Sequence, residues 1–247
     1  MESQLRVQRG GQGDPQLVLL HGLGATGDVW KGWRSWLDRA WPGRWLAPDL
    51  PGHGGSPPLP AYTFDGLASA VAEVLDTDSS TVVLGHSLGG VVGLALTRRT
   101  QVHAVVGLGI KVAWTDDELQ RAKALAAKPP AWFASRDEAA TRYLRVSGLT
   151  GLLAVDDAAV DSGLIEQDGR WRLAMDPAAF GVGAPDMRAL LAGTEAAVLL
   201  ARGEHDPMNA DEQLTELGSP TVTLAGLGHN AHVENPELTI TLLDPYR

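Results

Sequence analysis

The sequence predicts an α/β fold with a mostly parallel central sheet, helices on both faces of that sheet, and a mainly helical lid insertion. Short apolar runs alternate with helical patterns, which is typical of strands buried on both faces of a parallel sheet. The six runs span residues 17–20, 45–47, 81–84, 102–106, 196–200 and 222–224. This alternation stops between Ile110 and Met187, where helical patterns follow one another without a strand between them.

Length and composition describe an ordinary globular chain. Its 247 residues predict one domain, or one core domain with an insertion, and either is long enough to bury a large core. With 44% hydrophobic and 20% charged residues, the composition is that of a soluble protein. No apolar run approaches the roughly 20 residues that a membrane span needs. Residues 1–15 are polar and rich in glycine, and they contain no apolar segment of the secretory-signal type.

Charge and cysteine content limit the partners. The formal net charge of −10 argues against nucleic acid and anionic lipid as partners, and it favours a small, uncharged or cationic substrate. The absence of cysteine excludes disulfides, a thiol nucleophile and thiolate metal sites, and it suits a cytoplasmic location. The oligomeric state is left open.

The insertion divides the chain into a core of residues 1–109 and 188–247 and a lid of residues 110–187. Two capping-box patterns start helices in the lid, one from Thr115 to Glu118 and one from Ser135 to Glu138. Asp168 and Gly169 predict the turn of a small hairpin. Because open α/β sheets bind ligands beyond the carboxyl ends of their strands, we expect the lid to cover that edge.

Two further helix starts lie in the second half of the core. Asn209, with Glu212 three residues later, predicts a helix after the fifth apolar run. Asn235, followed by proline at the first helical position, predicts another after the sixth.

Ser87 is the candidate nucleophile. Residues 85–90 are Gly-His-Ser-Leu-Gly-Gly, and they stand between a predicted strand and a segment with helical spacing. In this context the G-x-S-x-G pattern predicts a nucleophile elbow, a sharp turn that holds serine in a strained backbone conformation. The flanking glycines remove side chains that would clash in such a turn. Taken alone, the pattern also fits a serine that only caps a helix.

A candidate acid and a candidate base follow the last two predicted strands. A serine hydroxyl needs a base within hydrogen-bond reach and a third group that orients the base. Asp206 and Glu204 come after the fifth apolar run, and His229 and His232 come after the sixth. Both loops begin at the carboxyl end of a predicted strand, which is the sheet edge that carries Ser87. Either carboxylate and either histidine could therefore complete a triad.

Five motifs, in this order, resemble the serine-nucleophile members of the α/β-hydrolase fold family. They are His21-Gly22-Leu23-Gly24, Asp49-Leu50-Pro51-Gly52-His53-Gly54, Gly85-His86-Ser87-Leu88-Gly89, Gly203-Glu204-His205-Asp206 and Gly228-His229. The order nucleophile, acid, histidine is that of this family.

The resemblance implies a role for each matching residue. Ser87 would be the nucleophile, His229 the general base and then general acid, and Asp206 the carboxylate that orients His229. The backbone N–H groups of Leu23 and Leu88 would form the oxyanion hole. Within these motifs Asp206 is preferred to Glu204, and His229 is preferred to His232.

Cofactor and metal sites have weaker support. Residues 22–27 fit G-x-G-x-x-G after a strand, and Asp49 follows about twenty residues later, as in dinucleotide sites. Asp49 lies inside the second hydrolase motif, however, so we expect no cofactor. His229 and His232 lack the helical spacing of a zinc site, and we expect no metal.

The sequence therefore predicts a serine hydrolase, carboxylesterase-like, that cleaves a carboxylic ester or thioester through an acyl-enzyme intermediate. The alternatives are a C–C bond hydrolase or acyltransferase of the same fold, and a ligand receptor that retains the triad but turns over slowly. The expected partner is a small ester-like substrate.

Overall fold

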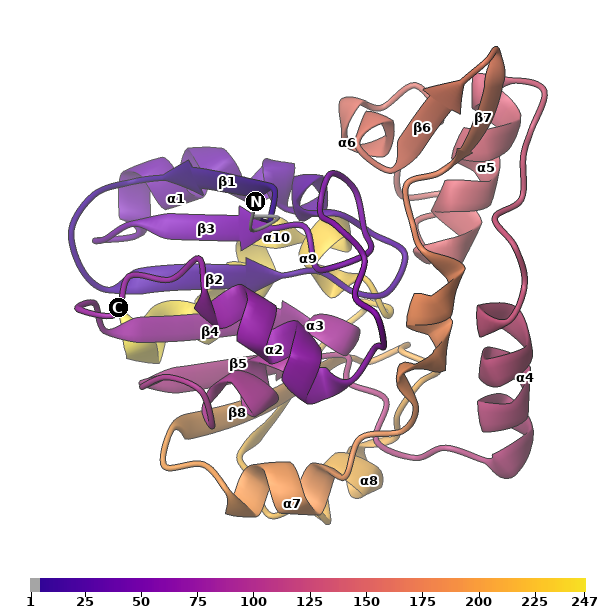
Figure 1. The fold of residues 1–247 in the computed structure, drawn as a ribbon. Helices are drawn as coiled ribbons and strands as arrows, with labels where there is room; N and C mark the ends of the chain where they lie inside the picture. Colours follow the sequence, from indigo (N-terminus) through magenta and orange to yellow (C-terminus); the bar gives the residue numbers. More distant parts are fainter. Residues whose placement is uncertain (1–4) are drawn as a thin grey trace.

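A seven-stranded sheet forms the centre of the computed structural model, which describes residues 5–247 (Figure 1). The spatial order of the strands is β1-β3-β2-β4-β5-β8-β9. Their bounds are β1 Val7–Gly10, β2 Gln16–Leu20, β3 Trp45–Pro48, β4 Thr81–His86, β5 Ala104–Leu108, β8 Ala197–Gly203 and β9 Thr221–Leu224. Every pair is parallel except β1 with β3. The predicted class of a mostly parallel α/β sheet is confirmed.

The six predicted strands are all present, and β1 is the one that sequence analysis missed. This edge strand pairs antiparallel with β3, and its four residues are Val-Gln-Arg-Gly. None of the four is fully buried. An edge strand of this kind lacks the apolar run by which buried parallel strands are recognised.

Two hydrophobic clusters, one on each face of the sheet, hold the helices. Leu17 and Leu19 of β2 belong to one cluster, while Val18 and Leu20 belong to the other. Successive side chains of a strand point to opposite faces, so a continuous apolar run serves both layers. The core helices are η1 Gly27–Trp33, α1 Arg34–Ala40, α2 Phe64–Ala72, α3 Leu88–Leu96, α7 Met187–Ala192, α8 Asp211–Thr215, α9 Ala231–Glu234, α10 Pro236–Ile240 and η3 Thr241–Tyr246.

One of the two core helix starts predicted from caps is correct. Asn235 accepts a hydrogen bond from the amide of Leu238 and precedes Pro236, as expected. The prediction that Asn209 caps α8 is wrong, because the N-cap is Ala210. Asn209 is instead buried, and its side-chain oxygen accepts from the Val112 amide at 3.1 Å.

Residues 110–187 form a separate group of elements beside the sheet (Figure 1). These are α4 Asp116–Ala126, α5 Arg136–Val146, α6 Ala158–Asp161, the hairpin strands β6 Leu164–Gln167 and β7 Arg170–Leu173, and η2 Pro177–Val182. Asp168 and Gly169 both adopt positive φ at the hairpin turn, as the sequence predicts.

The two capping boxes differ. Thr115 and Glu118 form both reciprocal hydrogen bonds, so the first box is complete. Ser135 accepts from the amide of Glu138, but the Glu138 carboxylate accepts from Ala134 instead of from Ser135. The second box is therefore only half formed.

Backbone hydrogen bonds join this group to the loop that follows β3. The amide of Gly54 donates to Ala174 at 2.6 Å, and the amide of Asp176 donates to Gly52 at 2.8 Å. On the other side, the Asn230 side chain donates to the Gly148 carbonyl at 3.0 Å. These bonds hold the group beside the loops that emerge from the carboxyl ends of the strands. No helix within residues 5–247 is long and apolar enough to cross a bilayer.

We predict that Gly89→Ala destabilises the protein at the start of α3. A β-carbon on Gly89 would lie 2.4 Å from the carbonyl oxygen and 2.6 Å from the carbonyl carbon of Leu20, and backbone atoms cannot move aside. Overpacking of this kind costs about 1–3 kcal/mol in the free energy of unfolding. Urea unfolding, followed by circular dichroism, measures this loss in the free energy of unfolding.

The matched control is Gly32→Ala, because a β-carbon there would meet only Pro236 Cγ, at 3.6 Å. Equal stability of the two variants would show that the contact between α3 and β2 tolerates a side chain.

Candidate active site

Ser87 lies at the turn between β4 and α3 with a backbone conformation that side chains rarely adopt. Its φ is 50° and its ψ is −115°. Its amide donates to the Leu108 carbonyl at 2.8 Å, which ties the turn to the end of β5. Residues on both sides of Ser87 are buried, whereas Ser87 itself is half-buried. The turn therefore holds the serine strained and partly open to solvent, as expected of a nucleophile elbow.

Asp206 and His229 form a hydrogen-bonded pair at the ends of β8 and β9. His229 Nδ1 lies 3.1 Å from one carboxylate oxygen of Asp206 and 3.0 Å from the other. The Asp206 side chain is fully buried, and it also accepts from the Met208 amide at 2.8 Å. Since a carboxylate only accepts, Nδ1 carries a proton and Nε2 is left as the free ring nitrogen.

Glu204 and His232, the alternatives to Asp206 and His229, have other hydrogen-bond partners or none. The Glu204 side chain is exposed, and its carboxylate accepts from the Gly226 amide at 2.7 Å. Within residues 5–247 it forms no hydrogen bond with His229. His232 is buried, and neither of its ring nitrogens has a hydrogen-bond partner among residues 5–247. The geometry thus favours Asp206 over Glu204 and His229 over His232.

Gly109 brings the pair close to the elbow. It directly follows Leu108, whose carbonyl accepts from Ser87. A β-carbon on Gly109 would lie 3.2 Å from both the Asp206 carboxylate and His229 Nδ1, so only glycine leaves room for the pair. Within the described residues, no hydrogen bond joins the Ser87 hydroxyl to His229. Such contacts often tighten only when substrate binds.

The two predicted oxyanion amides flank Ser87. Leu88 is the first residue of α3, where a helix leaves amides without internal partners. The loop of Leu23 is adjacent, since a β-carbon on Gly22 would lie 3.4 Å from Ser87 Cβ. Neither amide donates a backbone hydrogen bond elsewhere in residues 5–247.

Asp49 holds the loop that carries Leu23. Its buried carboxylate accepts from the amides of Gly27 at 2.8 Å and Gly55 at 2.9 Å, and from the Arg6 guanidinium at 3.0 Å. The acidic residue considered for a dinucleotide ribose is therefore fully engaged by its own loops. Among residues 5–247, no three His, Asp or Glu side chains gather in a way that would hold a metal ion.

A hollow of about 740 Å³ borders this edge of the sheet. It is lined by Leu23 of the oxyanion loop, by Met208 just after Asp206, and by residues of α4 and η2. The α4 residues include apolar side chains and the charged Glu118, Arg121 and Lys123. Trp114 lines it as well, which places one of the insertion's tryptophans beside the candidate site. The volume suits a small-molecule ligand.

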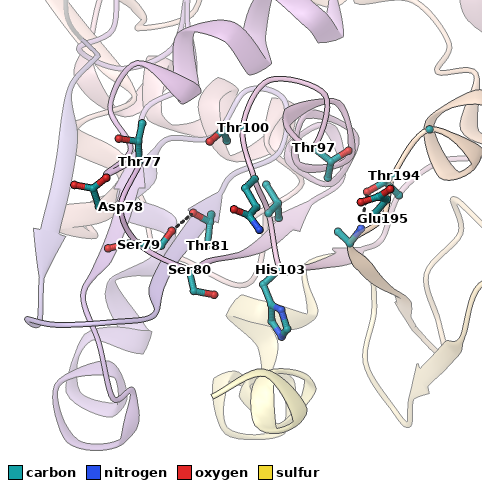
Figure 2. Close-up of a pocket in the computed structure, with 14 residues that line it drawn as sticks. Thr77, Asp78, Ser79, Ser80, Thr81, Thr97, Thr100, His103, Thr194 and Glu195 are labelled. Carbon is teal, nitrogen blue, oxygen red and sulfur yellow. Dashed lines mark hydrogen bonds between the residues drawn. The ribbon is translucent and has the colours of Figure 1, made fainter.

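A second hollow, of about 660 Å³, lies at the opposite edge of the sheet (Figure 2). Hydroxyl groups dominate its lining, with Thr77, Thr100 and Thr194 among them. Its one histidine, His103, is exposed and forms no hydrogen bond with a carboxylate in residues 5–247. It offers no paired nucleophile and base.

Comparison with known proteins agrees with the fold and with the motifs. Residues 17–242 match the family model described as "Alpha/beta hydrolase family". The chain belongs to this family. The relatives of this alpha/beta hydrolase include Lipase LipV of Mycobacterium tuberculosis, which is 35% identical over 69% of this chain and 67% of its own length. A pimeloyl-[acyl-carrier protein] methyl ester esterase of Methylococcus capsulatus is 38% identical over a shorter stretch, 38% of this chain and 35% of that protein.

One relative aligns with nearly the whole hydrolase. The 2-succinyl-6-hydroxy-2,4-cyclohexadiene-1-carboxylate synthase of Klebsiella pneumoniae is 29% identical over 96% of this chain and 95% of its own. Among solved structures, E-2-(acetamidomethylene)succinate hydrolase superposes with a TM-score of 0.81 at 21% identity, covering 98% of this chain and 94% of that one. At that identity the likeness shows the fold.

His86 links the Ser87 turn to the loop of His229 in this hydrolase. Its Nε2 lies 2.9 Å from the His229 carbonyl, so Nε2–H donates and the ring is the Nε2–H tautomer. The His86 ring packs on those of His229 and His232, with centroids 4.6 and 4.4 Å apart. His86 thereby fixes the loop of His229 relative to the residue next to Ser87. Sequence analysis gave His86 no such role, because nothing local to residue 86 marks its partner 143 positions away.

Four histidines of this hydrolase are buried, namely His21, His53, His86 and His232. Burial disfavours the charged imidazolium, and it lowers the pKa of His21 to about 4 and the pKa values of His53 and His232 to about 3. Burial also lowers the pKa of His86 well below its ordinary value.

We predict that acid unfolds the protein steeply between pH 6.5 and 4. In this range the unfolded chain binds protons at these histidines and the folded chain does not, so stability falls as pH falls. Each histidine contributes up to about 1.4 kcal/mol per pH unit to the free energy of unfolding. Above about pH 6.5 the contribution is complete. Urea unfolding at a series of pH values measures the slope.

His232→Phe should reduce this slope by up to about 1.4 kcal/mol per pH unit, the contribution of one histidine. Substitution of the exposed His103 by Gln should leave the slope unchanged. The slope is compared, so a general loss of stability in one variant does not affect the result. An unaltered slope in His232→Phe would contradict the assignment of a neutral, buried His232.

Proposed function

We propose that the chain is a serine hydrolase that cleaves a carboxylic ester or thioester through an acyl-enzyme intermediate. Ser87 is the nucleophile, His229 the general base and Asp206 the orienting carboxylate. The observation that carries this proposal is the Asp206–His229 pair, with Nδ1 at 3.0 and 3.1 Å from the two carboxylate oxygens, beside a serine held at positive φ. The esterases and the lipase among its relatives support the same chemistry.

In the first half of the reaction, His229 Nε2 takes the proton of the Ser87 hydroxyl while the oxygen attacks the substrate carbonyl carbon. The carbonyl oxygen becomes negative and accepts hydrogen bonds from the amides of Leu23 and Leu88. Asp206 stabilises the imidazolium and keeps its ring oriented. When the tetrahedral intermediate collapses, the imidazolium gives its proton to the departing alcohol or thiol, which leaves an acyl group on Ser87.

In the second half, water replaces the leaving group. His229 takes a proton from this water as it attacks the acyl carbon, and the same amides stabilise the new oxyanion. The bond to Ser87 then breaks, His229 returns the proton to the Ser87 oxygen, and the carboxylic acid leaves.

Residues 110–187 serve as a lid over a core formed by residues 1–109 and 188–247. The 740 Å³ hollow supports this division, because α4 and η2 supply one wall while Leu23 and Met208 supply the other. The substrate is a small ester-like molecule that binds between the two. The cytoplasmic location expected from the absence of cysteine stays a prediction.

A second candidate function is C–C bond chemistry or acyl transfer on the same triad. The relative from Klebsiella pneumoniae favours it, because it matches almost the whole chain and is named a synthase. Trapping of a covalent acyl-enzyme on Ser87 would favour ester hydrolysis or acyl transfer over C–C bond chemistry, because an acyl-enzyme forms in the first two reactions. Transfer is distinguished by a product that depends on an added alcohol or thiol acceptor. A slow receptor would give an initial burst with almost no steady-state turnover.

We predict that Ser87→Ala abolishes both p-nitrophenyl butyrate hydrolysis and labelling by a fluorophosphonate. The change removes one hydroxyl from a turn held by backbone contacts, so circular dichroism should be unaltered. The control is Ser80→Ala, at the opposite edge of the sheet (Figure 2). Labelling that persists in Ser87→Ala, or that vanishes in Ser80→Ala, would overturn the choice of nucleophile.

We predict that Asp206→Asn lowers kcat by up to about 10⁴-fold, because an amide can donate to Nδ1 and hold the wrong tautomer of His229. Glu204→Gln should change kcat less than about threefold, since Glu204 contacts Gly226 and not the histidine. Both variants are measured on one neutral ester. If Glu204→Gln were the more severe, the orienting acid would be Glu204.

A further inference from the structure

One segment of the insertion, residues 119–155, has a net charge opposite to that of the rest of the chain. Residues 119–155 contain six basic and two acidic residues, while the remainder has fourteen basic and twenty-eight acidic. The net charge of −10 therefore conceals a segment of net charge +4. This segment comprises most of α4, all of α5 and the connection between them, and it faces the candidate site through the contact of Val146 with Gly24 of the oxyanion loop.

Most of these cations have no anionic partner. Of the six, only Arg136 forms an ion pair within 4.0 Å among residues 5–247. The other five are Arg121, Lys123, Lys128, Arg142 and Arg145. Glu138 precedes Arg142 by one helical turn, but its carboxylate accepts from the Ala134 amide instead. Elsewhere in this protein basic side chains commonly pair with its many carboxylates, so an unpaired group of five requires a reason.

Two of the unpaired cations line an apolar hollow. Lys128 and half-buried Arg142 border a hollow of about 110 Å³ whose other walls are mostly apolar side chains. The apolar and proline residues that line it are Leu125, Pro129, Pro130, Ala131, Phe133, Val146, Leu173, Met175, Pro177 and Phe180. Its volume matches a few water-sized groups, which is the size of a carboxylate or a phosphate with a short piece of chain.

This small hollow adjoins the larger one, which is lined by Leu23 and Met208. Leu125 and Phe180 line both, so they form a common apolar wall. Lys111, in the larger hollow, is not available to a ligand anion, because it donates to Glu118 at 2.6 Å and lowers the pKa of that carboxyl to about 2. Arg121 and Lys123 also line the larger hollow, but both side chains are exposed. The half-buried free cation, Arg142, lies beyond the shared wall.

We propose that Lys128 and Arg142 bind an anionic group of the substrate, a carboxylate or a phosphate, which an apolar chain connects to the scissile carbonyl. The inference rests on the proposed hydrolase activity and adds the substrate class to it. Guanidinium and ammonium groups recognise carboxylates and phosphates through charge-assisted hydrogen bonds, which are strong where apolar walls exclude water. The substrate is thus an anionic acyl ester or thioester, in contrast to the uncharged or cationic one that the net charge suggested.

Two pairs of matched substrates test the proposal and locate the anion. The first pair is p-nitrophenyl hexanoate and the mono-p-nitrophenyl ester of adipic acid, which differ by a carboxylate at the far end of the acyl group. The second pair is S-hexanoyl pantetheine and S-hexanoyl phosphopantetheine, which differ by a phosphate on the leaving group. For each pair the quantity measured is the ratio of kcat/KM for the anionic to the neutral member.

We expect this ratio to be about tenfold or more in one pair, the value of a hydrogen bond to a charged group. It should fall toward one in Lys128→Gln/Arg142→Gln, and it should fall as salt concentration rises. Arg188→Gln removes an exposed cation from α7, outside the insertion, and should leave the ratio unchanged. Because a ratio is compared, a variant that is partly unfolded still reports on the anion.

Each outcome supports or overturns the proposed anion site. A high ratio in the first pair places the anion on the acyl group, and a high ratio in the second places it on the leaving group. Ratios near one in both pairs, with turnover that depends on Ser87, overturn the anion site and leave the hydrolase function standing. A high ratio that survives Lys128→Gln/Arg142→Gln overturns the assignment to these residues. Absence of Ser87-dependent turnover with all four substrates overturns both proposals.

Discussion

The backbone of Ser87, held at φ 50°, is the constraint on which the rest of the candidate site depends. A side chain in this region of conformational space costs of order 1–3 kcal/mol, so its surroundings must enforce it. They do so by close backbone approach. Gly89 lies against the Leu20 carbonyl, and the Ser87 amide is bound to Leu108. Two neighbouring strands of the sheet therefore fix the turn, which explains why it lies at the middle of the sheet, where strands flank it on both sides.

The other functional groups are fixed relative to that turn by a few buried polar contacts. Asp49 anchors the loop that carries Leu23, through the amides of Gly27 and Gly55. His86 donates to the carbonyl of His229 and thereby connects the Ser87 turn to the loop of His229. A buried carboxylate is costly to desolvate unless it accepts hydrogen bonds, and Asp49 accepts several. In this protein those bonds hold three loops from distant parts of the chain at one edge of the sheet.

The extent to which sequence predicts this arrangement follows from how local each feature is. The buried strands, the Ser87 turn and the Asp168–Gly169 hairpin are encoded within about ten residues, and all were predicted. Strand β1 has no apolar run, and Asn209 serves Val112 of a distant segment instead of capping α8, so local patterns failed at both. The choice of Asp206 over Glu204 came from a family pattern, and its physical reason, the pairing with His229, is visible only in three dimensions. Likewise, the basic residues of 119–155 can be read from the sequence, but only the structure shows that most of them form no ion pair.

Helix α4 is packed less tightly than the core, and this difference bears on function. The core side chains around Ser87 are buried on both faces of the sheet, whereas no residue of α4 is buried. Substitution in a close-packed interior disturbs the packing of neighbouring side chains and lowers stability, while substitution on an exposed helix costs little stability. The elbow and its partners are therefore confined to one geometry, whereas the exposed side chains of α4 can vary in charge and shape at little cost in stability. If the insertion is the lid that we propose, a change of substrate requires changes mainly there, and the basic segment 119–155 belongs to it.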